Sequence, residues 1–470
     1  MNAASPTIIV VGSGAAGLAA ALAAAETARG QTPACRIMLI DRAPQGQHGG
    51  NTRWSPSYMR MAAPDRVAPS FEEELCEVSG GRADRDYVRR LAREAPATIA
   101  WLMGHGIAFD TPVYYLSAGQ PRIQPVGGGI AVLRELERAA LEAGVAISYE
   151  RTAQRLAVGR DGAIEGLEVR HADGTRELVG AGAVVLAAGG FAGNPEMLAR
   201  HLGPGAETLR LISPGTRFNA GDGIEMALAV GARPAGDWSG MHAEPIDARS
   251  KGSAPVVLVY PYGMVVDRTG RRFFDEGAGL VHETWERFAR AIHFATPGGI
   301  AYAILDAKLF DIAGYERAVR SEVPPHTAGS IAGLASLIGV PADALQRTVA
   351  DYNTAATGDP AGFDATRADG LAAAGLSPPK SNWCRALDRP PFLAYPLVGA
   401  IAYTFGGVAT NAAAEVLGRG GPIPGLFAAG EITGHFHGTA PNAVAMLRAL
   451  VFGRIAGGGA VAYCQRRQHS

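Results

Sequence analysis

Three glycines near the start of the chain, Gly12, Gly14 and Gly17, follow the spacing Gly-x-Gly-x-x-Gly. In such a motif the first glycine permits a tight turn, the second lets the backbone approach a pyrophosphate, and the third lets a helix pack closely on a strand. Phosphate oxygens then meet the N–H groups at the start of that helix, where Ala15 and Ala16 stand. The spacing therefore predicts a site for a dinucleotide.

The elements that such a motif needs are present on both sides of it. The β-branched run Thr7–Val11 predicts a strand, the Ala- and Leu-rich segment that follows predicts a helix, and Arg36–Ile40 predicts a second strand. Asp41 ends that second strand, where an acid is placed to accept hydrogen bonds from ribose hydroxyls, with Arg42 beside it. Strand, helix and acid together favour dinucleotide binding over an empty glycine-rich turn.

Two distant segments indicate that the dinucleotide is FAD rather than NAD. In Val184–Phe191, an apolar strand runs through Ala188 into the pair Gly189-Gly190, where backbone can lie against a cofactor. In Pro422–Glu431, another buried strand delivers Gly430 and Glu431, over 400 residues from the first motif. Such a C-terminal piece suits the ribityl and pyrophosphate part of an extended FAD.

Composition narrows the class of protein further. The chain has 470 residues, 47% apolar and 19% charged, as expected for a globular protein of two or three domains. Its net charge is −1 without long runs of like charge, so we expect no nucleic-acid partner. The four cysteines form no CxxC pair, so no metal site is indicated. No apolar stretch reaches about 18 residues, so we expect no membrane insertion and a cytoplasmic location.

The order of the expected elements predicts an α/β fold in which one domain interrupts another. Residues 70–145 are expected to be mostly helical, and strands separated by Asp-Gly turns follow up to residue 171. Aromatic and charged residues become denser after residue 236, and the glycine-rich style resumes after residue 390. We therefore predict a Rossmann-like FAD-binding domain formed by residues 1–236 and 391–470, with an inserted α+β capping domain at residues 237–390.

Further segments extend the pattern beyond the dinucleotide site. They are Gly49–Arg53, Gly221–Ala227, His242–Arg249, Gly263–Glu276 and Val451–Gly457. With them the chain resembles, over most of its length, the flavoprotein family of fumarate reductase and succinate dehydrogenase, and within it the tricarballylate dehydrogenase (CobZ-like) branch. The resemblance implies a cap over the reactive face of the flavin. It also implies hydride exchange between flavin N5 and a CH–CH or C=C unit of a small-molecule substrate, with a separate electron-transfer partner.

The resemblance also implies where the flavin contacts lie. The cofactor-binding residues that we assign in addition to those already named are Gly49, Gly50, Asn51, Thr52, Asn219, Asp222, Asn442, Val444 and Ala445. Some members of the wider family attach the flavin covalently to a His well before a glycine pair. Here His48 directly precedes Gly49, which is the wrong spacing, so we predict non-covalent FAD.

The catalytic candidates come from comparison with the family pattern, which the chain follows at one position and departs from at two others. Where the fumarate reductases are expected to carry an Arg proton donor, this chain has Val259-Tyr-Pro-Tyr262, so Tyr260 and Tyr262 are candidates, with packing at a strand end as the alternative. His242 stands where the family often has a substrate-binding His. Tyr403 and Thr404 replace the family's His–Thr pair before a double glycine.

Recognition of a substrate carboxylate requires cations or hydrogen-bond donors in fork geometry. The candidates are Arg53, Arg122, His437 and Arg448, although most Arg side chains are simply solvated. Three functions stay open on the sequence alone. The first is an oxidoreductase acting on a small, tricarballylate-like carboxylate; the second is a 3-ketosteroid- or cyclic-ketone-type enone dehydrogenase; the third is a non-catalytic flavin-binding module.

Overall fold

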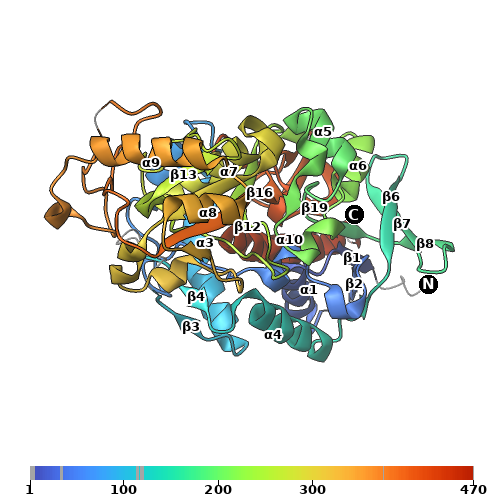
Figure 1. The fold of residues 1–470 in the computed structure, drawn as a ribbon. Helices are drawn as coiled ribbons and strands as arrows, with labels where there is room; N and C mark the ends of the chain where they lie inside the picture. The colour runs from blue at the N-terminus through green and yellow to red at the C-terminus, as the bar shows by residue number, and fades with distance from the viewer. Residues whose placement is uncertain (1–5, 32–34, 113–115, 117–120, 374, 469–470) are drawn as a thin grey trace.

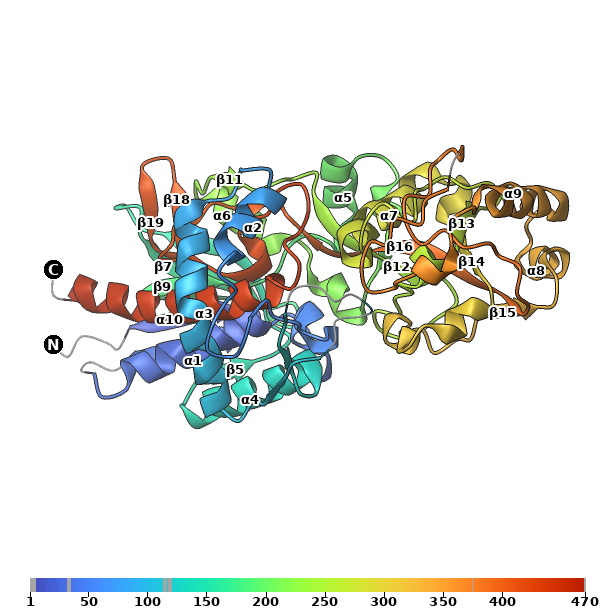
Figure 2. The same ribbon diagram turned by 90° about the vertical axis from the view of Figure 1, so that its left-hand side faces the viewer.

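A computed structural model describes residues 6–31, 35–112, 116, 121–373 and 375–468, which form two lobes (Figure 1). Seen from the side, the lobe that carries both chain ends holds the N-terminal elements and the C-terminal helix, and the other lobe holds most of residues 240–400 (Figure 2). The predicted mixed α/β class with an inserted second unit is confirmed.

The first lobe is built on a six-stranded sheet with the order β18-β19-β9-β1-β2-β5. Its strands are β1 (Thr7–Val11), β2 (Arg36–Ile40), β5 (Ala146–Ser148), β9 (Ala183–Leu186), β18 (Glu415–Gly418) and β19 (Gly421–Ala428). All neighbouring strands run parallel except β18 and β19. Strands from the two ends of the sequence therefore share one sheet, as the predicted two-piece domain requires.

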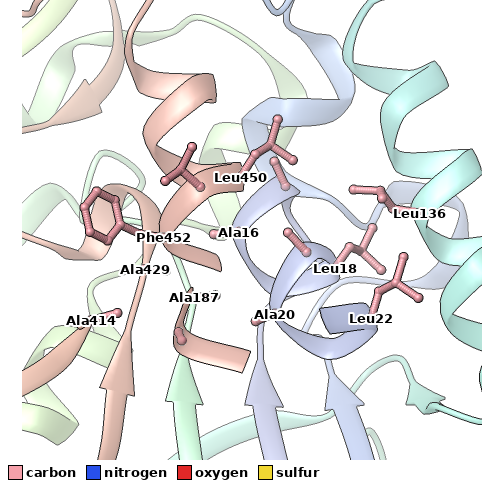
Figure 3. Close-up of a cluster of buried hydrophobic side chains, with 14 of the residues drawn as sticks. Ala16, Leu18, Ala20, Leu22, Leu136, Ala187, Ala414, Ala429, Leu450 and Phe452 are labelled. Carbon is pink, nitrogen blue, oxygen red and sulfur yellow. The ribbon is translucent and has the colours of Figure 1, made fainter. Parts of the chain in front are cut away.

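Helices α1 (Ala15–Ala28) and α10 (Ala445–Gln468) pack together on one face of this sheet (Figure 3). Their close approach depends on glycine, because a Cβ on Gly453 or Gly457 would lie 2.4 or 2.1 Å from a backbone oxygen of α1. Also on this lobe are α2 (Phe71–Val78), α3 (Arg85–Gly104), α4 (Gly128–Glu142) and the short strands β3 (Phe109–Asp110) and β4 (Gln124–Pro125). Helix α10 is long and apolar enough to cross a membrane, but 61% of its most apolar window is buried, as in a core helix.

The other face of the sheet is covered by a three-stranded antiparallel sheet and two short helices. These elements are β6 (Thr152–Val158), β7 (Ile164–Arg170), β8 (Arg176–Gly180), α5 (Pro195–Leu202) and α6 (Asp222–Ala229). The two predicted Asp-Gly turns connect β6 to β7 and β7 to β8, and their glycines have positive φ. A further pair, β11 (Pro234–Ala235) and β17 (Gly407–Val408), leads toward the second lobe.

The second lobe is organised around the long strand β16 (Phe392–Thr404), which pairs with four other strands. The remaining strands of this sheet are β10 (Arg210–Leu211), β12 (Met241–Asp247), β13 (Met264–Asp267), β14 (Ala301–Leu305) and β15 (His326–Ala328). Helix α7 (Val281–Ala295) packs on β12 and β16, and α8 (Ile331–Ile338) packs against α9 (Ala342–Ala355).

The domain limits at residues 236 and 390 stay a prediction, but the sheet itself extends beyond them on both sides. Strand β10 precedes residue 236 and β16 follows residue 390. Within this lobe β13 pairs with the distant β14, and the turn Asp267–Gly270 returns only to a single bridge at Arg272.

Candidate active site

A groove of about 1270 Å³ crosses the carboxyl ends of β1, β2, β9 and β19. Seventeen of the predicted cofactor residues line it, namely Gly12, Gly14, Ala15, Ala16, Asp41, Arg42, Gly49, Gly50, Asn51, Thr52, Ala188, Gly189, Asn219, Asp222, Gly430, Glu431 and Ala445. Residues far apart in the sequence thus converge on one groove. We call this groove the cofactor cavity.

The glycine loop leaves room for a ligand rather than for protein. A Cβ on Gly12 would lie 2.4 Å from the backbone oxygen of Ala187, so glycine is required there by the turn itself. At Gly14, in contrast, the nearest protein atom to an added Cβ is Thr52 Oγ1 at 3.6 Å, and φ is an ordinary −68°. Neither the backbone conformation nor a protein neighbour requires glycine at this position. The open space beside Gly14 is therefore suited to a pyrophosphate that approaches the backbone.

Asp41 is held in place by Ser13, the residue between the first two glycines. Its carboxylate accepts from the Ser13 N–H at 2.8 Å and from the Ser13 hydroxyl at 2.5 Å. The same hydroxyl lies 3.0 Å from His48 Nδ1, and His48 faces Glu137 and Tyr149. Burial lowers the pKa of His48 against the raising effect of Glu137. His48 therefore points into this network and is not among the residues that line the cofactor cavity.

The opposite wall of the cofactor cavity carries Glu431 and Arg448. The Glu431 carboxylate accepts from Asn219 Nδ2 and from the Thr404 N–H, both at 3.1 Å. Burial raises its pKa to about 7, despite these hydrogen bonds and the charge of Arg448. Arg448 Nη1 donates to the Thr433 oxygen at 3.2 Å, while its buried Nε has no hydrogen-bond partner among the described residues. A polar cofactor edge would supply that partner.

A second cavity of about 970 Å³ adjoins the first, and we call it the substrate cavity. The residues common to both linings are Asn51, Ser55, Tyr403, Ala445 and Met446. The rest of its wall comes from both lobes, and the second lobe contributes His242, Glu244, His282, Trp285 and Arg320. A ligand in this cavity therefore meets the flavin end of the cofactor cavity at Tyr403.

His242 lies between two carboxylates. Its Nδ1 is 3.0 Å from Glu286 Oε2 and its Nε2 is 3.1 Å from Glu244 Oε1. Burial alone would lower the pKa of His242, but the hydrogen bonds and charges of Glu244 and Glu286 raise it to about 9. The imidazole is therefore protonated at neutral pH. Burial and the charge of Glu286 raise the pKa of the neighbouring Tyr403 well above its usual value, so its phenol keeps its proton.

The far wall of the substrate cavity is under positive potential. Burial and the charges of Arg122 and Arg60 lower the pKa of His282 to about 4. Burial raises the pKa of Tyr58, against the opposing charges of Arg320 and Arg122. Arg122 is 1% exposed and its Nε donates to Asn442 Oδ1 at 2.9 Å, so it acts on the cavity from behind Asn442.

Two predicted catalytic residues lie outside both cavities. Tyr260 is fully buried, and its hydroxyl lies 2.9 Å from Thr284 Oγ1 in the core of the second lobe. The Tyr262 hydroxyl donates to the backbone oxygen of Ala365 at 2.9 Å. Both side chains are packing residues, as the alternative interpretation held, but they belong to a short 3-10 helix, Tyr260–Tyr262, that precedes strand β13 and not to a strand end. The catalytic role predicted for them has no geometric support.

Several other assignments change because of where the side chains lie. Thr404 lines neither cavity; its hydroxyl accepts from the Phe191 N–H, and its own N–H binds Glu431. His437 also lies outside both cavities, and Arg448 lines the cofactor cavity instead of the substrate cavity. Arg53 faces an outer groove beside Arg317 and Arg320. Of the predicted cofactor residues, Gly17, Gly190 and Val444 serve packing, and Asn442 lines the substrate cavity.

The sequence reasoning missed most of the substrate cavity. Glu244 could have been predicted, because residues i and i+2 of a strand share a face and Glu244 lies two residues after His242 on β12. Ser13 could also have been predicted as a site residue, because it lies inside the glycine motif. Glu286, Trp285, His282 and Arg320 carry no local signal, since only the packing of α7 and the adjoining loop brings them to the cavity. Among the residues that the structure describes, no cluster of His, Cys, Asp or Glu is placed to hold a metal ion.

Fold and site together define an FAD-dependent oxidoreductase with a cofactor domain and a second lobe over the flavin end. The family model described as "FAD binding domain" matches residues 7–445, and the chain belongs to this family. The probable fumarate reductase Ifc3 of Shewanella frigidimarina (strain NCIMB 400) is 30% identical over an alignment covering 96% of this chain and 74% of that protein.

Two further relatives show how widely this architecture is used. The 4-oxocyclohexanecarboxylate 2-dehydrogenase of Sinomonas cyclohexanicum is 30% identical over 77% of this chain and 66% of its own. The open conformation of a flavocytochrome c3 fumarate reductase superimposes with a TM-score of 0.78 at 27% identity, covering 98% of this chain and 78% of that one. The predicted FAD cofactor and the resemblance to fumarate reductase flavoproteins are confirmed.

Proposed function

We propose that the protein exchanges a hydride between FAD and the CH–CH or C=C unit of a small carboxylate. The observation that carries the proposal is the common wall of the two cavities, where Tyr403 and Asn51 face both. Reductases and dehydrogenases named for C=C chemistry recur among the relatives, including fumarate reductases, a urocanate reductase and an NADH:acrylate oxidoreductase.

Bound FAD supplies the two-electron donor or acceptor at N5. In the reducing direction the C=C unit gains a hydride at one carbon and a proton at the other. The hydride carries two electrons away from the reduced flavin, which is thereby oxidised. The protein has to supply the proton. Tyr403 faces both cavities and keeps its phenolic proton, so we assign it as the proton donor to the substrate. The protonated imidazole of His242 stacks on its ring, with centroids 4.7 Å apart, and positions it.

The carboxylate of the substrate is assigned to Arg320, with the potential of Arg122 behind Asn442. An Arg guanidinium suits a carboxylate by both charge and fork geometry. Tricarballylate stays in the proposal through the resemblance in the sequence. A cyclic-ketone dehydrogenase is the second candidate, favoured by Tyr403 in the cavity wall and by the 30% identity to the 4-oxocyclohexanecarboxylate dehydrogenase.

The test is an anaerobic screen in both directions. Oxidised holoenzyme is mixed with saturated acids and ketones, including tricarballylate, and loss of the oxidised flavin band is followed. Dithionite-reduced holoenzyme is mixed with the corresponding unsaturated acids and enones, and return of the band is followed. A response to carboxylates supports the proposal, and a response to ketones alone selects the second candidate. If no compound changes the flavin band in either direction, the proposal fails, and a non-catalytic flavin-binding module is the function that stands.

Three further points belong to the same proposal. We propose that FAD is held without a covalent bond, that electrons pass to or from a separate redox partner, and that the protein works in the cytoplasm. The second point is supported by the single Gly-x-Gly-x-x-Gly motif, which the cofactor occupies. Reduction of the holoenzyme by NADH alone would contradict it.

A further inference from the structure

Among the described residues, four aromatic side chains line the substrate cavity, namely Trp54, Tyr58, Trp285 and Tyr403. They come from three separate parts of the chain, the turn after Gly50, helix α7 and strand β16. Between two of them lies His242, stacked on Tyr403 and 5.9 Å, centroid to centroid, from Trp285. The rings of Trp285, His242 and Tyr403 thus form one row, and Trp54 and Tyr58 add aromatic wall to the same cavity, which suits a flat or cyclic group better than a chain of carboxylates.

The charges in the cavity match a single carboxylate. Arg320 is the one guanidinium among the described residues that line it, and it stands at the mouth of the cavity, since it is exposed and also lines the outer groove. The negative charge of Glu244 is already paired with His242 at 3.1 Å. His282 adds no charge at neutral pH, because burial and the charges of Arg122 and Arg60 lower its pKa to about 4. A tricarboxylate would bring more charge than this one guanidinium compensates, so the inference narrows the proposed function away from tricarballylate.

Resting on the proposed function, we infer that the substrate of this site is a monocarboxylate that carries a ring, either aryl or cyclohexenyl, with its C=C bond conjugated to the carboxylate. Arg320 receives the carboxylate, and the rings of Trp285, Tyr58 and Trp54 receive the cyclic group. The C=C bond takes a hydride at the β carbon and a proton at the α carbon, and the reduced flavin is oxidised by two electrons.

Pairs of compounds that differ in one feature test the inference. Reduced holoenzyme is mixed anaerobically with cinnamate or with crotonate, which replaces the phenyl ring by a methyl group. Cyclohex-1-enecarboxylate, cis-aconitate and cinnamamide complete the set. We expect cinnamate or cyclohexenecarboxylate to reoxidise the flavin at least about tenfold faster than crotonate at equal concentration, and cis-aconitate and cinnamamide to be slower still.

Three outcomes separate this inference from the proposed function. If crotonate or cis-aconitate reacts as fast as the ring acids, the inference is overturned while the proposed function stands. If cinnamamide reoxidises the flavin as fast as cinnamate does, the assigned binding of the substrate carboxylate by Arg320 is overturned. If no acid reoxidises the flavin, the proposed function itself fails and the inference fails with it.

Variants test separately the residue assigned to the carboxylate and the residues assigned to the ring. Arg320→Gln should lower the apparent affinity for cinnamate at least about tenfold and leave that for cinnamamide unchanged. Arg317→Gln is the matched control, because Arg317 lines only the outer groove. Trp54→Leu should remove the preference for cinnamate over crotonate; Trp285→Leu repeats this test on helix α7. If both Trp variants prefer cinnamate over crotonate as strongly as the wild type does, the assigned binding site for the ring is contradicted.

Discussion

The imidazole of His242 stacks on the ring of Tyr403, with centroids 4.7 Å apart and planes inclined by 25°. The two residues face each other across β12 and β16, and a bulge follows His242 on its strand. Glu244 and Glu286 hold the imidazole from its two nitrogens. This arrangement holds a protonated imidazole against Tyr403, the tyrosine that lines both cavities among the described residues.

Replacing Tyr403 by Phe should remove the proton donor and leave cofactor binding intact. We expect flavin reoxidation by the best substrate to fall by about 10²- to 10⁴-fold, as for loss of a general acid, with unchanged FAD content. Rapid mixing gives the rate and absorbance gives the FAD content.

The matched control is Tyr260→Phe, which also removes one phenolic hydroxyl. Because Tyr260 is bonded to Thr284 in the core, we expect a loss of about 1 kcal/mol in the free energy of unfolding and an unchanged rate. A slow Tyr260→Phe variant combined with a fast Tyr403→Phe variant would reverse the assignment.

Stability should depend on pH through His242. Its folded pKa of about 9 lies above the ordinary value of 6.5, because the two Glu partners outweigh the effect of burial. The stabilisation is therefore complete below pH 6.5 and is lost as the pH rises through about 9. Its size is at most about 3 kcal/mol, at ~1.4 kcal/mol for each factor of ten in proton affinity.

Urea denaturation between pH 6 and pH 9.5, roughly the span set by these pKa values, checks this dependence. His242→Gln should flatten the fall in the free energy of unfolding. His171→Gln is the control, since His171 pairs with Glu177 on the β7–β8 hairpin, and it should keep the wild-type slope. An unchanged slope in His242→Gln would show that the buried ion pairs do not hold a proton there.

Gly14→Ala should weaken FAD binding without harming the apoprotein. The added Cβ meets only Thr52 Oγ1 at 3.6 Å, so the unfolding temperature of the apoprotein should not change, whereas the FAD dissociation constant should rise about tenfold or more. Gly457→Ala gives the opposite pattern, because its Cβ would lie 2.1 Å from the Ala20 oxygen and destabilise the α1–α10 contact. Fluorescence titration and thermal melts distinguish the two.

FAD should leave the denatured protein completely. His48 is buried and bound to Ser13 and Glu137, so its ring is not offered to the flavin. Acid precipitation should leave all the yellow colour in the supernatant, and His48→Ala should not change that result. Colour retained in the wild-type pellet but lost from the variant would establish covalent attachment at His48.

The cofactor site could be predicted because its signals are local. Gly12, Gly14 and Asp41 lie within one strand–helix–strand unit, and each position follows from backbone geometry or from the end of a strand. Glu431 was also found, since a buried apolar strand ending in an acid is visible in the sequence even when its partners are 400 residues away.

The substrate cavity could not be predicted in the same way, because it is made by packing between elements. Glu286 reaches His242 only through the position of α7 on β12 and β16. Tyr260 and Tyr403 are equivalent as sequence signals, both being tyrosines near strand ends, yet one points into the core and the other into the cavity. Side-chain direction at such positions depends on tertiary contacts that the sequence does not display.

The most direct test of the account is a crystal structure of the FAD complex. We predict that the isoalloxazine ring lies at the wall common to both cavities, against Asn51, Tyr403 and Ala445, with the adenosine toward Asp41 and Arg42. An isoalloxazine ring bound at the Asp41 end, or one separated from Tyr403 by protein, would contradict the claim that the flavin meets its substrate at this junction.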